Sequence, residues 1–239
     1  MTLNRHLDRY VRFVNLLMND TTYLLDDALM HLGKISEIQR AMDDKAAWDA
    51  QPATERQEQE KLLREHEGGA RSDLDFGTES LRLLKRFAGE TKEPFLTREI
   101  VDRLAAMLDM NLVMLAGPRC QDLKVRDMEK YKFRPKELLS DVLGIFLELA
   151  PRVEFQEAVA KDGRSYSRDL FERVQRIARK TSIRTDDELE GIKVLVEKVE
   201  ALKAAEEEDD AMGEVPDDFL GKHFILAACR SRADSFLTA

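Results

Sequence analysis

Apolar residues recur at helical spacing from the start of the chain. Residues 3–17 carry apolar side chains at Leu3, Leu7, Tyr10, Val14 and Leu17. Steps of three and four residues place these side chains on one face of an α-helix. The pattern therefore predicts a helix over 3–17, with Asn19 or Asp20 capping the helix that follows, because both residue types favour that position.

A long, charged helical stretch is predicted over residues 54–88. It opens with Thr54 and Gln57, which have the spacing of a capping box, in which two side chains satisfy the free N–H groups at a helix start. Gly68 and Gly69 weaken its middle, so we expect a break or kink there.

The later helices are delimited by proline, glycine and capping residues. Proline fits the first position of a helix and breaks a helix interior, and glycine suits the left-handed residue that closes many helices. Further helices are expected from Ile100 to Leu115 with a stop at Gly117-Pro118, from Pro135 to Leu149, through Phe155 and Val159 with a left-handed Gly163, from a Ser167 cap through Ile177, and from a Thr185–Glu188 capping box through Val199.

The sequence shows no pair of alternating runs joined by a hairpin turn, so the expected class is all-α with no sheet. Each predicted helix has one apolar face, and the connections are short. The helices must therefore pack on one another, as a bundle or as a stacked solenoid. The sequence shows no fixed-period repeat that would decide between the two.

Composition narrows the class of protein. The 239 residues are 43% hydrophobic and 36% charged, which suits a chain with a buried core and a solvated surface. The net charge of −9 makes nucleic acid an unexpected partner. No uncharged apolar run of about 18 residues occurs, so no membrane insertion is expected. Charged residues interrupt residues 1–17, which argues against a secretory signal. The two cysteines are too few for a disulfide framework, so a cytoplasmic and nuclear location is expected.

Motifs for catalysis are missing from the pattern. The four histidines, His6, His31, His66 and His223, lack metal-ligand spacing, and no glycine-rich phosphate loop follows a strand. Cys120 follows Arg119, a cation that would favour a reactive thiolate, yet the residues around it favour a small buried side chain in a turn. We therefore predict no catalytic, cofactor-binding or metal-binding residue, and no cofactor.

Three polar segments have both a functional and a structural interpretation. The basic segment 119–136, with Tyr131 and Phe133, could bind an acidic partner or RNA, or be a connection pinned by its aromatic residues. The loop from Asp162 to Tyr166 could be a contact loop or a structural turn. The doublets Asp26-Asp27 and Asp43-Asp44 are expected to face water. For each segment the sequence favours the structural interpretation. The basic side chains of the first segment are Arg119, Lys124, Arg126, Lys130, Lys132, Arg134 and Lys136.

Several stretches read in order resemble the core of the ubiquitin conjugation factors, which are chain-elongation ubiquitin ligases with a C-terminal U-box. The resemblance covers roughly residues 10–220, and its order and spacing are more specific than any single stretch. The stretches are Phe13–Thr22, Glu99–Leu108, Leu115–Cys120, Leu123–Val125, Glu129–Tyr131, Pro135–Leu139, Ala158–Tyr166 and Gly213–Leu220.

The resemblance implies stacked armadillo-like helical repeats and a role in extending ubiquitin chains on proteins that already carry ubiquitin. It also implies ubiquitin-dependent degradation, including the degradation associated with the endoplasmic reticulum. Implied partners are the ubiquitin-conjugating machinery, ubiquitylated substrates and a AAA-ATPase segregase. In such ligases the U-box docks the loaded conjugating enzyme, and the contribution of the ligase is positioning.

Two departures from the family qualify the expected activity. Residues 1–212 resemble only the C-terminal part of the core, and residues 213–239 are expected to be a linker and a divergent tail, because Gly221 to Ala239 do not resemble a U-box. We therefore expect the chain to be inactive as a ligase by itself. The alternative is a non-enzymatic helical adaptor that binds partners of the full ligase.

Overall fold

The computed structural model describes residues 2–213, and within this range it is all-helical with no strand, as predicted. Residues 1–200 form one compact unit, and the packing described below is internal to it. The α-helices are α1 (Thr2–Asp43), α2 (Lys45–Ala50), α3 (Ala53–Glu90), α4 (Val101–Ala116), α5 (Pro135–Leu149), α6 (Val153–Lys161), α7 (Arg168–Thr181) and α8 (Asp186–Gly213). Short 3₁₀ helices lie at Glu93–Leu96, Pro118–Leu123 and Glu129–Tyr131.

The first helix is one uninterrupted rod, so the predicted cap at Asn19 or Asp20 is wrong. Buried apolar residues keep the same helical spacing on both sides of that point, from Val14 and Met18 to Leu25. Asn19 uses its side-chain oxygen to accept a hydrogen bond from Arg103 of α4. Its polar group is therefore satisfied between helices, and it does not end one.

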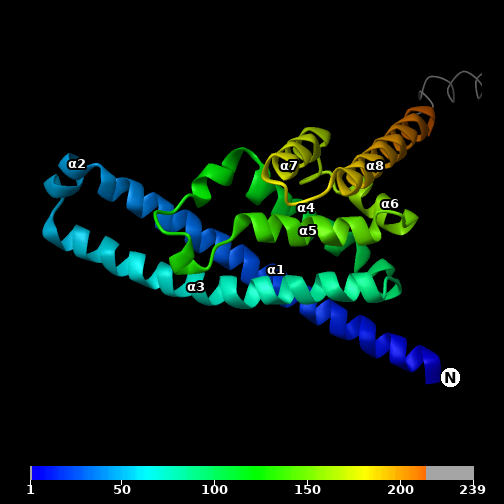
Figure 1. The fold of residues 1–239 in the computed structure, drawn as a ribbon, viewed down its shortest axis with the longest axis horizontal. Coiled ribbons are helices and arrows are strands. Elements are labelled where there is room, and N and C mark those ends of the chain that lie inside the picture. The colour runs from blue at the N-terminus through cyan, green and yellow to red at the C-terminus, as the bar shows by residue number, and fades with distance from the viewer. Residues whose placement is uncertain (1, 214–239) are drawn as a thin grey trace, which may run out of the picture. The chain divides into compact units, whose positions relative to one another are not determined.

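The long helix α3 pairs with α1 through the short α2, and the two lie side by side in Figure 1. Phe87 near the end of α3 meets Tyr10 and Phe13 near the start of α1, with ring centroids 5.8 and 5.6 Å apart. At the other end, Gly69 lies against His31. These contacts make α1 and α3 an antiparallel hairpin.

Two local predictions for α3 are wrong. Thr54 does not cap it, because the helix already begins after Pro52 and has no side-chain cap. Gly68 and Gly69 do not break it, because α3 runs unbroken through both. A Cβ at Gly69 would lie 2.5 Å from Nε2 of His31, so this glycine allows α1 to come close.

The second half of the core is built around Phe146 of α5. Its ring meets Phe155 of α6 and Phe171 of α7 edge to face, with centroids 5.7 and 5.4 Å apart. All three rings are fully buried. Pro135 at the first turn of α5 and Gly117 after α4 set the helix boundaries as predicted.

Two predicted caps are confirmed. Oγ of Ser167 accepts from the Leu170 N–H at 3.2 Å and begins α7. Thr185 and Glu188 form a reciprocal capping box at α8, with N–H to side-chain oxygen distances of 2.8 and 3.3 Å.

The predicted left-handed Gly163 is wrong. No described glycine has a positive φ, and α6 ends at Lys161 with Asp162 as its cap, whose Oδ1 accepts from the N–H of Arg164 at 3.1 Å. Two described residues close helices in the left-handed conformation: Ser182 after α7 at φ 53° and Lys132 after the 3₁₀ helix Glu129–Tyr131 at φ 55°.

Beyond Glu200 the structure describes the remainder of α8, where Glu206 to Glu208 are exposed on the helix, as expected for a solvated helix end. The predicted linker and tail, residues 213–239, lie outside the described residues apart from Gly213. Within the described range no helix is long and apolar enough to cross a lipid bilayer.

Candidate functional site

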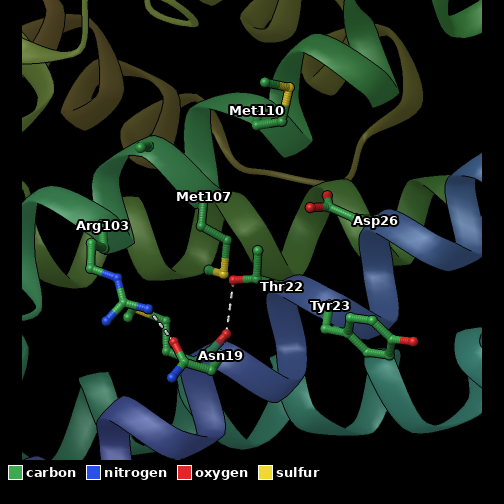
Figure 2. Close-up of a pocket in the computed structure, with 9 residues that line it drawn as sticks. Asn19, Thr22, Tyr23, Asp26, Arg103, Met107 and Met110 are labelled. Atoms are coloured by element: carbon green, nitrogen blue, oxygen red, sulfur yellow. Dashed lines mark hydrogen bonds between the residues drawn. The ribbon is translucent and has the colours of Figure 1, made fainter.

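A groove of about 530 Å³ runs between α1 and α4, two helices that lie in the same direction at this point. Figure 2 shows its residues from both helices. Met18 and Met107 are buried at its floor, whereas Met110 and Tyr23 are 43% and 66% exposed at its edge. The residues that line it are Met18, Asn19, Thr22, Tyr23, Asp26, Arg103, Ala106, Met107 and Met110.

Polar groups at one end of the groove come mainly from α1. Arg103 of α4 donates to Oδ1 of Asn15 at 2.8 Å and also to Oδ1 of Asn19. These two amides thus hold its guanidinium along α1. Thr22 donates to the backbone carbonyl of Met18 at 2.8 Å, which satisfies its hydroxyl within the helix.

Asp26 brings negative charge to the groove, and Figure 2 shows its carboxylate directed toward the space between the two helices. Burial and then the neighbouring Asp27 raise the pKa of Asp26 above its usual range. A hydrogen bond to Asp27 raises the pKa of Tyr23. Asp26 is exposed, as predicted, and it also lies beside an apolar groove.

A second hollow, of about 410 Å³, follows along α1. No atom lies within 4 Å of the position that a Cβ would take at Gly33, so its floor is open there. Lys34 and Glu37 pair at 2.9 Å, and Arg40 faces Asp122 at 3.8 Å, so charges of both signs are present here. Its lining residues are Leu29, Met30, Gly33, Lys34, Glu37, Arg40, Met114, Asp122 and Leu123.

The methionine side chains that line this surface suit apolar contacts with a partner. Methionine side chains are flexible and polarisable, which suits apolar contacts with partners of varied shape. The described residues contain no group of three or more histidine, cysteine or acidic side chains placed to hold a metal ion. The expectation of no catalytic, cofactor-binding or metal-binding residue stays a prediction.

The basic segment 119–136 is a connection, and the structural interpretation is confirmed. Tyr131 and Phe133 are buried at 1% and 3% exposure. Four of its basic side chains contact carboxylates: Arg126 with Asp43 at 2.6 Å, Lys130 with Glu67 at 2.6 Å, Lys132 with Asp75 at 2.7 Å, and Arg134 with Glu129 and Glu137 at 3.5 and 3.7 Å. Much of the positive charge is therefore offset by α1, α3 and nearby acidic residues.

The other sequence candidates also have structural roles. Cys120 is a partly exposed free cysteine in the 3₁₀ turn that packs on α1 and α4. Tyr166, from the loop after α6, is buried and donates to Glu200 at 2.7 Å, so this loop is a structural turn. Asp43 and Asp44 are exposed, yet Asp44 caps α2 by accepting from the Ala47 N–H at 3.2 Å.

The structure brings together two pairs of titratable groups that sequence reasoning missed. His31 and His66, treated as scattered, meet across α1 and α3 with 2.8 Å between their Nδ1 atoms. Nε2 of His31 faces Oδ2 of Asp73 at 3.7 Å. One signal in the sequence could have found this pair. The two histidines lie at nearly equal numbers of residues before and after the short α2, so an antiparallel hairpin that turns at α2 brings them together.

The second missed pair is Asp109 of α4 and Asp162 at the end of α6. Asp109 is fully buried, and burial followed by the charge of Asp162 raises its pKa to about 9. Among the described residues no N–H group or cation donates to either oxygen of Asp109. Burial and the nearby Asp162 therefore favour the protonated form of Asp109.

Comparison with known proteins shows which family this helical unit is similar to. The family described as "Ubiquitin elongating factor core" matches residues 2–200. The chain is 43% identical over 217 residues to "Ubiquitin conjugation factor E4" of Schizosaccharomyces pombe, covering 90% of this chain and 21% of that protein. It is 38% identical over 217 residues to "E4 ubiquitin-protein ligase UFD2" of Saccharomyces cerevisiae, covering 89% of this chain and 22% of that protein.

A plant protein, "Probable ubiquitin conjugation factor E4" of Arabidopsis thaliana, is 37% identical over 218 residues, covering 88% of this chain and 21% of the relative. The chain thus spans about a fifth of the length of the curated relatives it matches. The match extends over nearly all the described helices. This chain belongs to the ubiquitin elongating factor core family.

Proposed function

We propose that this chain is part of the core of a ubiquitin chain-elongation ligase, where it holds partner proteins in position for ubiquitin transfer. The observation that carries the proposal is the 43% identity to a ubiquitin conjugation factor across 90% of the chain. A match of this extent includes the helices that form the groove and those that form the core. The role in chain elongation follows from the family.

The proposed contribution of the chain is positioning. Holding two reactants in the correct geometry converts an encounter in solution into an effectively unimolecular step. Rigid helices suit this role because α1 and α3 brace each other along their length, and α5, α6 and α7 share one aromatic core. We further propose that these helices belong to an armadillo-like stack, in which each repeat buries its apolar face on its neighbours.

The proposed partners follow from the same resemblance: the ubiquitin-conjugating machinery, ubiquitylated substrates and a AAA-ATPase segregase. The proposed setting is ubiquitin-dependent degradation in the cytoplasm and nucleus, including degradation associated with the endoplasmic reticulum. Co-purification of the segregase and ubiquitylated proteins with the tagged chain would support these partners. A tagged chain that retains neither would contradict them.

A chimaera tests the core role directly. The segment of the Saccharomyces cerevisiae relative that matches this chain is replaced by the chain, and chain extension on a ubiquitylated substrate is measured with activating enzyme, conjugating enzyme and ubiquitin. We expect the chimaera to extend chains, and the relative without the segment to fail. A folded chimaera with no more activity than the deletion would contradict the proposal.

The 239 residues by themselves are proposed to be inactive as a ligase, because they match the core of the family, the part proposed to position partners. In the same assay they are expected to leave chain length at background. Clear extension by the purified chain would contradict this part of the proposal.

The adaptor alternative is favoured by the groove between α1 and α4, a surface suited to binding. An adaptor would compete with the full ligase. Adding excess chain to an active relative should then slow extension of ubiquitin chains, whereas an unchanged rate would exclude competition.

A further inference from the structure

The surface between α1 and α4 combines apolar depth, length and unbalanced charge. Its floor and edges carry Met18, Met107 and Met110, and the second hollow adds Met30 and Met114. Methionine-rich grooves accept apolar side chains of varied shape, and a helix inserts such side chains at steps of three, four and seven residues. The content of the groove therefore fits one face of an amphipathic helix.

The length of the surface also fits a helix. The two hollows follow each other along residues 19–37 of α1, which rise about 27 Å. Along this path Arg103, Met110 and Met114 succeed one another on α4. Nothing lies within 4 Å of the Cβ position of Gly33, so the floor of the second hollow is open at that point.

Charge sets which helix fits. Midway along the path Asp26 and Asp27 lie together, and partial burial with mutual repulsion disfavours ionised Asp26. The guanidinium of Arg103, at the Asn19 end of the path, donates to the neutral side-chain amides of Asn15 and Asn19 and keeps its positive charge. A cation on a bound partner would relieve the repulsion at Asp26.

The charges at the far end of the surface are paired. Lys34 pairs with Glu37 at 2.9 Å, and Arg40 faces Asp122 at 3.8 Å. A basic side chain of a partner is therefore stabilised beside Asp26, in the middle of the path, more than beside Arg103 or Arg40.

We propose that the groove between α1 and α4 docks an amphipathic helix of a partner protein, which inserts apolar side chains among Met107, Met110 and Met30 and places a lysine or arginine on Asp26. The proposal rests on the proposed function of the chain as a partner-binding core. It adds the chemical class of the partner.

The experiment uses the full chain and a phage-displayed library of helical peptides of about 18 residues, the length that spans the groove. The library is first depleted on the Met110→Glu variant and then selected on the native chain. We expect enriched peptides that share apolar residues at helical spacing and a lysine or arginine near the middle of the peptide. A library that yields no enriched peptide, or yields acidic ones, would overturn the proposal.

Affinities of the selected peptides then test the two contacts separately. We expect Met110→Glu and Asp26→Lys each to weaken binding about tenfold or more, and a peptide with lysine changed to glutamate to regain affinity for Asp26→Lys. Phe76→Glu on α3 and Glu157→Lys on α6 are matched controls outside the groove and should bind normally. Equal affinity for native chain and groove variants would sink the proposal.

Two checks make the result interpretable. Thermal unfolding must show that each variant is folded, and the altered side chains are at least partly exposed, so we expect little change. Sedimentation of the native chain and Met110→Glu tests a second copy as the occupant. If the native chain is a dimer and Met110→Glu dissociates it, the occupant of the groove is a second copy of the chain, and the proposed partner helix is wrong. This test requires no ligase activity, so its failure and that of the chimaera are distinguishable.

Discussion

Nδ1 of His31 on α1 lies 2.8 Å from Nδ1 of His66 on α3, although the two residues are 35 positions apart in the chain. At this distance one nitrogen carries a proton and the other accepts it. Gly69, one turn further along α3, leaves room for the His31 ring. The pair and the glycine together fix the register of the α1–α3 hairpin at the end nearer α2.

Gly69→Ala is expected to destabilise the protein, because its Cβ would fall 2.5 Å from Nε2 of His31 and force the ring to move. We expect a loss of about 1–3 kcal/mol in the free energy of unfolding, as for other overpacked sites. Gly68→Ala is the matched control, since nothing lies within 4 Å of its Cβ position. It should gain about 0.5–1 kcal/mol from helix propensity. Urea unfolding measures both, and equal effects would refute the close contact.

The His31–His66 contact predicts a loss of stability in mild acid. Burial, followed by the charges of His31 and Lys34, lowers the pKa of His66 below its ordinary value of about 6.5. The folded state therefore binds this proton less readily than the unfolded chain. The free energy of unfolding should fall as the pH drops through the unfolded pKa toward the lower folded one.

His66→Gln removes this titration and keeps a polar group beside His31. We expect its stability to change less than that of the native chain between pH 7 and pH 5, by urea unfolding at both values. An unchanged dependence on pH would show that the histidine pair does not control it.

The buried Asp109 predicts the opposite trend at higher pH. Its pKa, raised to about 9 by burial and by Asp162, lies above that of the unfolded chain, about 3.9. The folded state binds this proton more tightly. Stability should therefore decline as the pH rises from about 4 through about 9.

Asp109→Asn keeps the shape of the side chain, does not ionise and removes the repulsion between two carboxylates. We expect it to be more stable than the native chain by about 1–3 kcal/mol at pH 8, the range for relieving a buried unsatisfied polar group. At pH 4 the two should be similar. Asp102→Asn, an exposed change on the same helix, should leave the pH dependence unaltered. A destabilised Asp109→Asn at pH 8 would mean that the carboxylate is needed in its charged form.

Gln39 of α1 contacts two residues of the connection 117–134 and holds it against this helix. Its Oε1 accepts from the Arg126 N–H at 2.9 Å, and its Nε2 lies 3.5 Å from the hydroxyl of Tyr131. Gln39→Ala leaves the Arg126 N–H without this partner and should cost about 1–3 kcal/mol. Hydrogen exchange should become faster at that amide. Lys124→Ala is the control, because its side chain is exposed and only its backbone carbonyl contacts Ser36, at 2.9 Å. An unchanged rate of hydrogen exchange at the Arg126 amide in Gln39→Ala would contradict this role of Gln39.

Local signals in the sequence determined much of the helical plan. Pro135 begins α5, Gly117 follows α4, and the caps at Ser167 and Thr185 form as predicted. Each of these depends on interactions within one or two turns, so neighbouring residues suffice to predict them. The apolar periodicity also indicated the all-α class, because it requires each helix to bury one face on another.

Tertiary packing decided what the local pattern could not. Asn19 is a residue type that favours caps, yet it lies inside α1, where the buried apolar spacing continues past it and Arg103 of α4 binds its side chain. Glycine disfavours a helix interior, yet at Gly69 the missing Cβ leaves room for the His31 ring. The groove with Asp26 also needs two helices from distant parts of the chain. A sequence pattern records which face is apolar, and only the packed fold determines which residues meet across it.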